Sequence, residues 1–499
     1  MNKINDFDMK YTNFIFSNSF RLFSILLMGI MLSAGENLYA QATDIVTYAA
    51  PEGAKLNDTY SVMVRQNNGD WQLVPSYNVM VDEVAGTNHN VRNCSMAYFD
   101  FAGTVDVKVI YNKGTVDKAQ VRPLSYDIKH SVNGNEITFQ LDCSRNLSIE
   151  VNGDIFNNLQ LFANPIDTYR PTSKDLKRLK KDSNYIYFAP GYHKIDRLTV
   201  GTNQTVYVSG GAIVDGEIVV DHADNAKVLG RGMIYPYRKK GLIVSHSSNV
   251  KIDGIFTTQT TVSDSHDVSL NNVKVMSYYG WGDGFNVFSS TNVAYTHVFA
   301  RTSDDCSSIY ASRGEHHGGC RNIMMEDAVL WADVAHPFTV GLHGDAKRPD
   351  TIEDLFYKNV DVLDMKEKQI DYQGVFAIIA GDNNTVRNVT FENIRIENFR
   401  EGKLFDIRVV NNKKYCAAPG LAIENINFNN ISYNGDRAEL SLIIGYNESR
   451  KVKGVHFKNL VINGEVIYDK MPGKPGWYKT SDMASIFIGE HVEDVTFEK

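Results

Sequence analysis

One short pattern recurs from about residue 249 to the C-terminus, and it constrains the fold more than any other feature of the sequence. In each copy, apolar and polar residues alternate, the alternation changes phase at an Asn-like position, and a second alternating stretch follows. Val268–Val275, Val293–Ala300 and Val389–Ile396 are examples. Alternation with a period of two indicates strands rather than helices. Asn tolerates the left-handed backbone conformation that a tight bend between two strands requires. At the change of phase the sequence has Asn272, Asn359, Asn393, Asn430 and Asn459.

The spacing of the copies identifies the kind of repeat. Successive copies begin 18 to 40 residues apart. Three strands of about five residues and three short connections need roughly 25–33 residues, so each copy fits one coil of a parallel β-helix. A β-propeller is the competing repeat fold, but its blades would show regular Asn-Gly or Asp-Gly hairpin turns, which are scarce here. We expect the first coils near residues 185, 205 and 228.

Residues 43–170 have a different pattern. Tyr60–Val64, Val105–Tyr111 and Ile137–Leu141 alternate cleanly and are separated by polar turns. Short strands with such turns between them predict an antiparallel β-sandwich. The Lys-rich segment Arg170–Asp182 is a short helix or a surface linker. The sequence therefore predicts an all-β chain, with a β-sandwich over residues 43–170 followed by a parallel β-helix over 171–499.

The N-terminus has the order of a secretory leader. Lys10 and Arg21 precede an apolar stretch over residues 22–34, and Ala40-Gln41-Ala42 has the small residues of a cleavage site. The apolar stretch is too short to span a bilayer comfortably. We expect residues 1–42 to be a signal peptide and the mature chain to be secreted or periplasmic, without a membrane anchor.

Charge and cysteine content exclude several classes of function. The net charge is −8 and no Lys/Arg run is present, which disfavours a nucleic-acid partner. The five cysteines include no Cys-x-x-Cys pair, so we expect no zinc or redox motif and no cofactor. Cys306 and Cys320 either form a disulfide or are buried free thiols. We expect a monomer.

Three aspartates stand out by their position after predicted strands. Asp283 lies in Trp281-Gly-Asp-Gly-Phe-Asn286, and Asp304 and Asp305 follow 21 and 22 residues later, about one coil further on. Residues one coil apart stack as neighbours, so the three carboxylates should converge. Clustered carboxylates repel one another, which raises at least one pKa and supplies a general acid beside a general base. Glycoside cleavage needs that pair, although such a cluster can also bind calcium.

These motifs resemble the polygalacturonase clan of glycoside hydrolases, which are right-handed β-helices. The resemblance rests on Gly-Asp-Gly-Phe-Asn, on Asp-Asp-Cys306, and on Ala335-His336-Pro-Phe, which is similar to that clan's Gly-His-Gly segment. A sandwich before the helix and Trp331-Ala-Asp-Val-Ala-His336 are similar to the dextranase and isopullulanase family, glycoside hydrolase family 49. The resemblance implies that Asp304, the first Asp of the pair, donates the proton.

Two departures from the polygalacturonase pattern concern the substrate. Trp281-Gly282 stands where polygalacturonases have Asn-Thr, and the later Gly-Val-Arg-Ile-Lys segment corresponds here to Gly374-Val-Phe-Ala-Ile378. An apolar strand cannot neutralise a uronate carboxylate, unless Arg408 on the next coil replaces the missing cations. The sequence favours a neutral glycan, with an α-glucan of the dextran or pullulan type as the first guess and an acidic glycan as the alternative.

The predicted mechanism is inverting, with Asp304 as the general acid and Asp283 and Asp305 activating water. An inverting site separates acid and base by about 6.5–9.5 Å. A polysaccharide lyase and a non-catalytic glycan-binding β-helix are the competing functions. Further candidates for substrate contact, besides Trp281, are Trp331, Asp333, His336, His343, Asp345, Tyr372, Asp382 and Arg408.

Overall fold

The computed structural model describes residues 45–85 and 88–499 of the chain, and residues 45–499 form one compact unit. The predicted signal peptide lies outside the described residues. Within those residues, no helix is long and apolar enough to cross a membrane. The structure is almost entirely β, as predicted.

Two sheets make up the N-terminal part. One has the order β1-β5-β11-β10-β7, with β4 beside β5, and the other has the order β3-β2-β6-β9-β8. The first comprises β1 (Ile45–Thr47), β4 (Tyr77–Ala85), β5 (Asn88–Phe101), β7 (Ala119–Arg122), β10 (Arg145–Val151) and β11 (Asp154–Pro165). The second comprises β2 (Tyr60–Arg65), β3 (Gln72–Val74), β6 (Val105–Tyr111), β8 (His130–Asn133) and β9 (Glu136–Leu141).

The two sheets enclose a common apolar core that includes Val62, Phe99, Val107 and Leu161. The pairing is antiparallel, as expected for a sandwich, except that β11 runs parallel to β5. A 3₁₀ turn, η1 (Leu124–Tyr126), and the helix α2 (Ser173–Leu179) follow β7 and β11 respectively. Thr172 caps α2 by accepting a hydrogen bond from the Asp175 backbone N–H.

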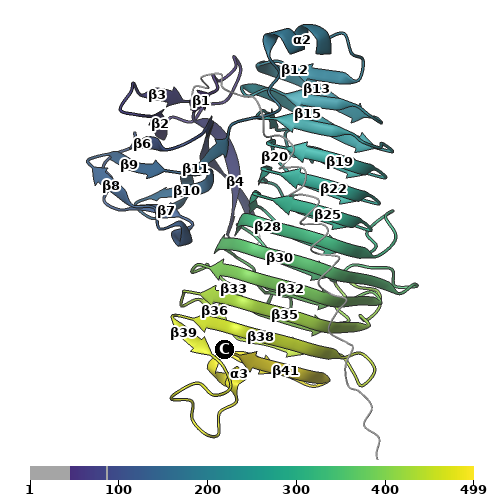
Figure 1. Ribbon diagram of the computed structural model, residues 1–499. Coiled ribbons are helices and arrows are strands. Elements are labelled where there is room, and N and C mark those ends of the chain that lie inside the picture. Colours follow the sequence, from purple (N-terminus) through teal and green to yellow (C-terminus); the bar gives the residue numbers. More distant parts are fainter. Residues whose placement is uncertain (1–44, 86–87) are drawn as a thin grey trace, which may run out of the picture. The chain divides into compact units, whose positions relative to one another are not determined.

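The rest of the chain forms one sheet of parallel coils, a right-handed β-helix (Figure 1). The first coil begins with β12 (Tyr185–Phe188) and β13 (Gly191–Val200), and β14 (Thr205–Val208) and β15 (Ala212–Asp221) stack on them in the next coil. The next strands, in chain order, are β16 (Lys227–Gly230), β17 (Met233–Ile234), β18 (Leu242–Ser245), β19 (Ser248–Asp253), β20 (Phe256–Thr257), β21 (Thr260–Ser263), β22 (His266–Asn271), β23 (Lys274–Met276), β24 (Phe285–Phe288), β25 (Thr291–Thr296), β26 (Phe299–Thr302) and β27 (Ser307–Tyr310).

From β28 onward the two strands on either side of the Asn bend are continuous. These strands and their short partners are β28 (Cys320–Ala332), β29 (Phe338–Gly341), β30 (Asp350–Asp364), β31 (Phe376–Ala380), β32 (Asn384–Ile396), β33 (Gly402–Lys403), β34 (Phe405–Val409), β35 (Ala422–Tyr433), β36 (Ala438–Glu439), β37 (Ser441–Ile444), β38 (Val452–Ile462), β39 (Glu465–Ile467), β40 (Ile486–Ile488) and β41 (Val492–Glu498). A 3₁₀ turn, η2 (Ile370–Tyr372), and the helix α3 (Thr480–Met483) complete the elements.

The Asn residues at the bends behave as the sequence predicts. All five have positive φ, between 54° and 56°. Their side chains bond to one another from coil to coil: Asn430 donates to Asn393 at 3.0 Å, and Asn459 donates to Asn430 at 2.9 Å. Inside the coils, rings also stack in register, as in Phe428 on Phe457 with centroids 5.0 Å apart. The backbone bend, the hydrogen bond between Asn side chains and the stacked ring thus recur from one coil to the next.

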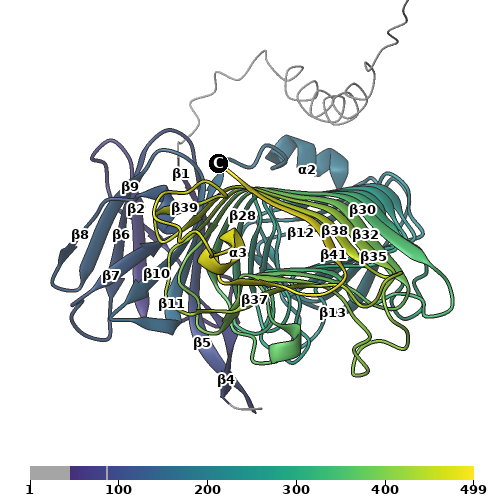
Figure 2. The same cartoon turned by 90° about the horizontal axis from the view of Figure 1, so that it is seen from below.

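The N-terminal sheets lie along one side of the coils (Figures 1 and 2). The apolar cluster between them contains Val79 and Met96 from the sheets and outward-facing residues from several coils. The coil residues in this cluster are Ile213, Met233, Phe256, Met276, Phe299, Val329, Trp331 and Leu363. The N-terminal sheets therefore cover this side of the β-helix. The open face is formed by the third strand of each coil, which is β18, β21, β24, β27, β29 or β31.

Candidate active site

Asp283 lies in the connection between β23 and β24, where two glycines let neighbouring coils approach closely. A Cβ on Gly282 would lie 2.4 Å from the Ser303 Oγ, and a Cβ on Gly284 would lie 2.4 Å from the Cys306 carbonyl oxygen. Any other residue at either position would push the coils apart. The Gly-Asp-Gly sequence thus holds Asp283 against the next coil.

The next coil places Asp304 and Asp305 beside Asp283. β24 pairs with β27 in parallel, and the Gly284 N–H donates to the Asp305 carbonyl oxygen at 2.8 Å. One carboxylate oxygen from each of the three aspartates lies within 4.8 Å of the others. The convergence that the one-coil spacing predicts is therefore present. This separation of the nearest oxygens is shorter than the roughly 6.5–9.5 Å between the carboxyl groups of a typical inverting pair.

Asp283 is held by two amides. Its Oδ2 accepts from Asn286 Nδ2 at 2.8 Å and from Gln259 Nε2 at 3.2 Å. Burial and the negative charge of Asp305 raise its pKa to about 7, against the partial opposition of the Asn286 hydrogen bond. Asp283 therefore exchanges its proton near neutral pH.

Asp305 has the opposite electrostatic environment. Burial opposes its ionisation, but the His336 cation and several hydrogen bonds outweigh burial and lower its pKa below the usual value. His336 Nδ1 lies 2.7 Å from Asp305 Oδ1, and the Tyr310 hydroxyl donates to Oδ2 at 3.0 Å. His336 Nε2 is bonded to the Tyr372 carbonyl oxygen. Both imidazole nitrogens thus face acceptors, and Asp305, outweighing burial, raises the pKa of His336 to about 9.

Asp304 has no cation among its hydrogen-bond partners in the described residues. Burial, together with the charges of Asp283 and Asp305, raises its pKa well above the usual value. The cluster therefore contains a carboxyl that keeps its proton, Asp304, next to a carboxylate that has lost it, Asp305. Such an arrangement can protonate a leaving group and accept a proton from water at the same site.

The aspartates line a groove of about 1620 Å³ on the open face of the β-helix. Three other predicted contact residues line it too: Trp281, His343 and Tyr372. The Trp281 side chain is 86% exposed, which leaves an indole face free for a sugar ring. Burial, reinforced by the Arg313 charge, lowers the pKa of His343 to about 4, so this imidazole is neutral in the groove.

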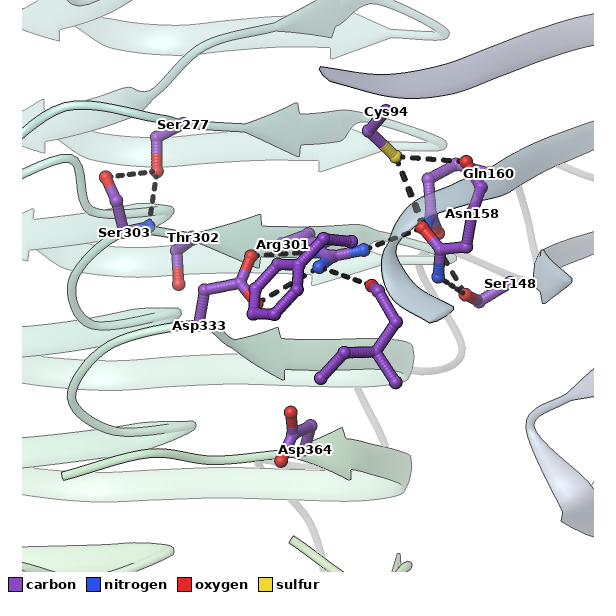
Figure 3. Close-up of polar contacts among 12 residues, drawn as sticks. Cys94, Ser148, Asn158, Gln160, Ser277, Arg301, Thr302, Ser303, Asp333 and Asp364 are labelled. Atoms are coloured by element: carbon purple, nitrogen blue, oxygen red, sulfur yellow. Dashed lines mark hydrogen bonds and ion pairs between the residues drawn. The ribbon is translucent and has the colours of Figure 1, made fainter. Parts of the chain in front are cut away.

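His336 lies behind the groove and is fully buried, so it cannot contact a sugar and acts instead on Asp305. Trp331 and Asp333 are also fully buried, on the side that the N-terminal sheets cover. Figure 3 shows Asp333 paired with Arg301, whose guanidinium also reaches Asn158 of β11. A sugar cannot reach Trp331 or Asp333, and both hold the sheets to the coils.

Asp345, Asp382 and Arg408 lie outside the groove. Asp345 accepts from the Lys347 N–H at 2.9 Å, and Asp382 accepts from the Ala417 N–H at 2.7 Å, so each shapes a loop. Arg408 pairs with Asp406 on its own strand. It therefore does not replace the missing cations in the groove.

Sequence reasoning missed several groove residues. Gln259 lies one coil before Asp283, and Asn286 and Tyr310 are outward-facing residues of β24 and β27. The sequence does indicate the position of Asn286, because Thr261, Asn286 and Ser308 occupy the same register position in three successive coils. Lys240, Arg313, His246 and His316 also line the groove. Lys240, Arg313 and His316 lie in connections of irregular length, for which the repeat predicts no position.

The five described cysteines are all free, so Cys306 and Cys320 are buried thiols and not a disulfide. Among the described residues, the three aspartates are one of three side-chain groups with a spacing that could hold a metal ion. The other two groups are centred on His246.

A family model supplies the decisive comparison. The model for glycosyl hydrolases family 28 matches residues 193–473, which is more than half of the 499 residues. The chain belongs to glycosyl hydrolase family 28. Membership of family 28 confirms the predicted polygalacturonase-like clan and identifies the chain as an O-glycosyl hydrolase. The three aspartates all lie within the residues that the family 28 model matches.

A solved structure with a TM-score above 0.5 supports this fold. Dex49A from Penicillium minioluteum superposes with a TM-score of 0.61 at 12% identity, covering 90% of this chain and 96% of its own. The family 28 exopolygalacturonase of Yersinia enterocolitica gives a TM-score of 0.45 at 12% identity, covering 79% and 97%. The endo-xylogalacturonan hydrolase of Aspergillus tubingensis gives 0.41 at 16% identity, covering 65% and 90%. No curated protein sequence matches the chain.

Proposed function

We propose that this protein is an exported hydrolase that cleaves polysaccharide chains in the groove over β21, β24 and β27. The observation that carries the proposal is the division of the three aspartates into a protonated member and a hydrogen-bonded anion. A non-catalytic glycan-binding β-helix would gain nothing from burying three carboxyls together, since their repulsion is destabilising.

In the proposed reaction Asp304 donates its proton to the glycosidic oxygen as the bond to the anomeric carbon breaks. Asp283 and Asp305 together hold one water, which attacks the anomeric carbon from the opposite face, gives one proton to this pair and keeps the other on the new hydroxyl group. The product then has the inverted configuration. The partners of Asp283 and Asp305 favour this role, because amides, hydroxyls and an imidazolium fix both carboxylates as acceptors.

The short separation of the carboxylate oxygens is compatible with inversion only if the water binds to Asp283 and Asp305 and does not lie directly across from Asp304. A pair of bases permits this, because Asp283 and Asp305 come from adjacent coils and approach one water from two directions. The configuration of the first product tests this arrangement.

The proposed substrate is a neutral glycan, with an α-glucan of the dextran or pullulan type as the first guess. The support is the chemistry of β31, whose residues are buried and apolar where a uronate-binding member of the clan would need cations. Arg408 is committed to Asp406 and does not line the groove. The choice of α-glucan rests on the resemblance to family 49 stated above.

An acidic glycan is a second candidate, because Lys240 and Arg313 line the groove. Neither has a carboxylate partner within 4.0 Å among the described residues, and their positive charges both act on Asp283. Two unpaired cations next to the reacting centre suit a substrate with a carboxylate or sulfate group.

A substrate screen separates these possibilities. The mature protein is incubated with dextran, pullulan, other neutral glycans and polygalacturonate, and new reducing ends are measured, with Asp304→Asn as the inactive control. We expect reducing ends from a neutral glycan. Turnover of polygalacturonate alone would establish the acidic candidate, ultraviolet-absorbing products would indicate a lyase, and no turnover of any glycan would contradict the proposal.

Export and assembly are further parts of the proposal. We propose cleavage near Ala40 or Ala42 and a monomeric mature protein. Mass spectrometry of the protein recovered from its host should show that residues 1–39 are absent. Light scattering should give the mass of one chain. A mature protein that retains those residues contradicts export by this leader.

A further inference from the structure

A second cluster of ionisable side chains lies at the other edge of the same groove. Here the chain turns from the third strand of each coil back to the first. His222, His246 and Asp264 each occupy the left-handed position of this turn in three successive coils, with φ of 48°, 46° and 43°. The residues just before them are in register, since Asp221 pairs with Ser245 and Ser245 with Ser263. The turn therefore stacks the three side chains in one column.

A fourth member, His316, reaches this column from the connection after β27. The backbone of Arg313 and His316 is fixed by two reciprocal hydrogen bonds of 2.9 and 3.1 Å, which tighten the connection into a turn. His316 Nδ1 lies 2.5 Å from Asp264 Oδ2, and His246 Nε2 lies 3.3 Å from the same oxygen. Two imidazoles from different parts of the chain thus share one carboxylate.

We propose that His246, His316 and Asp264 bind a divalent transition-metal ion of the zinc class. In tetrahedral zinc coordination with bonds of about 2.0–2.1 Å, neighbouring ligand atoms are about 3.3 Å apart. The three ligand atoms here lie within 4.8 Å of one another, so small side-chain movements suffice to coordinate an ion. Two imidazoles and a carboxylate are a typical zinc ligand set that leaves one coordination position open.

The surroundings of His246 supply the support that a metal-bound imidazole usually has. If Nε2 takes the metal, Nδ1 carries the proton, and Nδ1 faces Ser245 Oγ at 2.9 Å and Asp221 Oδ1 at 3.7 Å. A carboxylate that orients the distal nitrogen is the common outer partner of a zinc-bound histidine. Because one neutral imidazole coordinates through one nitrogen, the column binds a single ion.

Simple ion pairing explains this cluster less well. His222 and His246 stack almost parallel, with centroids 4.6 Å apart and an interplanar angle of 11°. Elsewhere in the described residues, each His–carboxylate pair involves a single imidazole, as in His297 with Asp327 at 3.3 Å. Here His246 and His316 instead approach the same Asp264 oxygen, as the ligands of one ion would.

The proposed ion lies apart from the catalytic aspartates. Asp283 precedes the start of β24, whereas Asp264 follows Ser263, which pairs with Phe288 at the end of β24. The four-residue strand between them is about 13 Å long at 3.3 Å per residue. His222, His246 and His316 line the same groove as the aspartates. The proposed site therefore borders the space where a glycan would lie.

The test is a titration of the chelator-treated mature protein with Zn²⁺ by isothermal calorimetry, together with thermal unfolding. We expect one Zn²⁺ per chain and an increase in Tm, with no such increase from Ca²⁺, which prefers oxygen ligands. His316→Gln and Asp264→Asn should each weaken zinc binding at least about tenfold, and Asp221→Asn by about 10–100-fold.

Matched controls distinguish this site from others. His297→Gln removes an imidazole with the same 3.3 Å carboxylate contact and should leave zinc affinity unchanged, as should His222→Gln. Asp304→Asn should also leave it unchanged, because the catalytic aspartates are not the ligands. The proposal is overturned if saturable one-to-one binding is missing, if His316→Gln and Asp264→Asn bind zinc normally, or if binding is lost in His222→Gln or Asp304→Asn.

Discussion

His336 Nδ1 lies 2.7 Å from Asp305 Oδ1, in a pair that is buried on both sides. The two residues are separated by one coil of the β-helix, and the Cys306 N–H also donates to the His336 carbonyl oxygen at 2.8 Å. The imidazolium keeps Asp305 ionised although Asp283 and Asp304 lie beside it. The catalytic proposal depends on this pair, because without it the three carboxyls would share their protons with no fixed division of roles.

Replacement of the proposed acid should abolish catalysis of natural substrates. Asp304→Asn removes the transferable proton and should lower kcat by a few orders of magnitude, with glycan binding nearly unchanged. An aryl glycoside with a good leaving group needs little protonation, so the variant should lose much less activity on it. Steady-state kinetics on both substrates, with circular dichroism as the folding control, checks this. An equal loss on both substrates would contradict the role of Asp304.

The pH dependence of activity should report the His336–Asp305 pair. Because the imidazolium lowers the pKa of Asp305, its removal in His336→Gln raises that pKa and moves the acidic limb of the pH profile to higher pH. In the wild type the contribution of the His336 cation to stability should be full below pH 6.5, decline as the pH rises, and be lost by about pH 9, the pKa of His336 in the folded protein. Profiles of kcat/KM and of Tm from pH 4 to 10 measure both. A variant with an unshifted acidic limb would show that His336 has only a structural role.

Trp281 should bind substrate without taking part in chemistry. Trp281→Ala removes an exposed indole from the groove and should raise KM about tenfold, from roughly 1–3 kcal/mol of lost stacking, with little change in kcat. Trp477, which is 84% exposed and lies outside the groove, provides the matched control Trp477→Ala. If both variants have the same KM, Trp281 does not contact the glycan.

The buried Asp333 should matter for stability and not for turnover. Asp333→Ala leaves the Arg301 guanidinium buried without its carboxylate, and this should lower the free energy of unfolding by about 3–5 kcal/mol. Asp345→Ala, in a partly exposed turn, should change it by less than about 0.5 kcal/mol. Urea unfolding measures both, and kcat of the folded fraction should stay near the wild-type value. A kcat that falls by orders of magnitude in fully folded Asp333→Ala would show that Asp333 contributes to catalysis.

The sequence predicts those parts of the fold and site that depend on the repeat. Asn272 and Asn359 mark bends because each coil repeats the same backbone conformation, and Asp283 meets Asp304 because one coil returns the chain to the same place. Trp331 is misplaced because the repeat does not show which outward face the N-terminal sheets cover. The large apolar residues at Met276, Phe299 and Val329 carry that signal, since they point outward and would otherwise be exposed.

Residues in connections of irregular length cannot be placed from the repeat alone. His316 and Arg313 reach the groove through a turn whose geometry depends on hydrogen bonds between these two residues, which no period encodes. The separation of the carboxylates is likewise a tertiary quantity. It depends on how closely Gly282 and Gly284 let the coils approach, which the spacing along the chain does not give.

The configuration of the first-formed product tests the central claim most directly. If Asp283 and Asp305 activate a water while Asp304 protonates the leaving group, hydrolysis proceeds in a single displacement at the anomeric carbon. Proton NMR of the reaction in its first minutes, before the new reducing end mutarotates, should show the anomer opposite to that of the cleaved linkage. A first product that keeps the configuration of the substrate would require a covalent glycosyl-enzyme intermediate and would contradict this account.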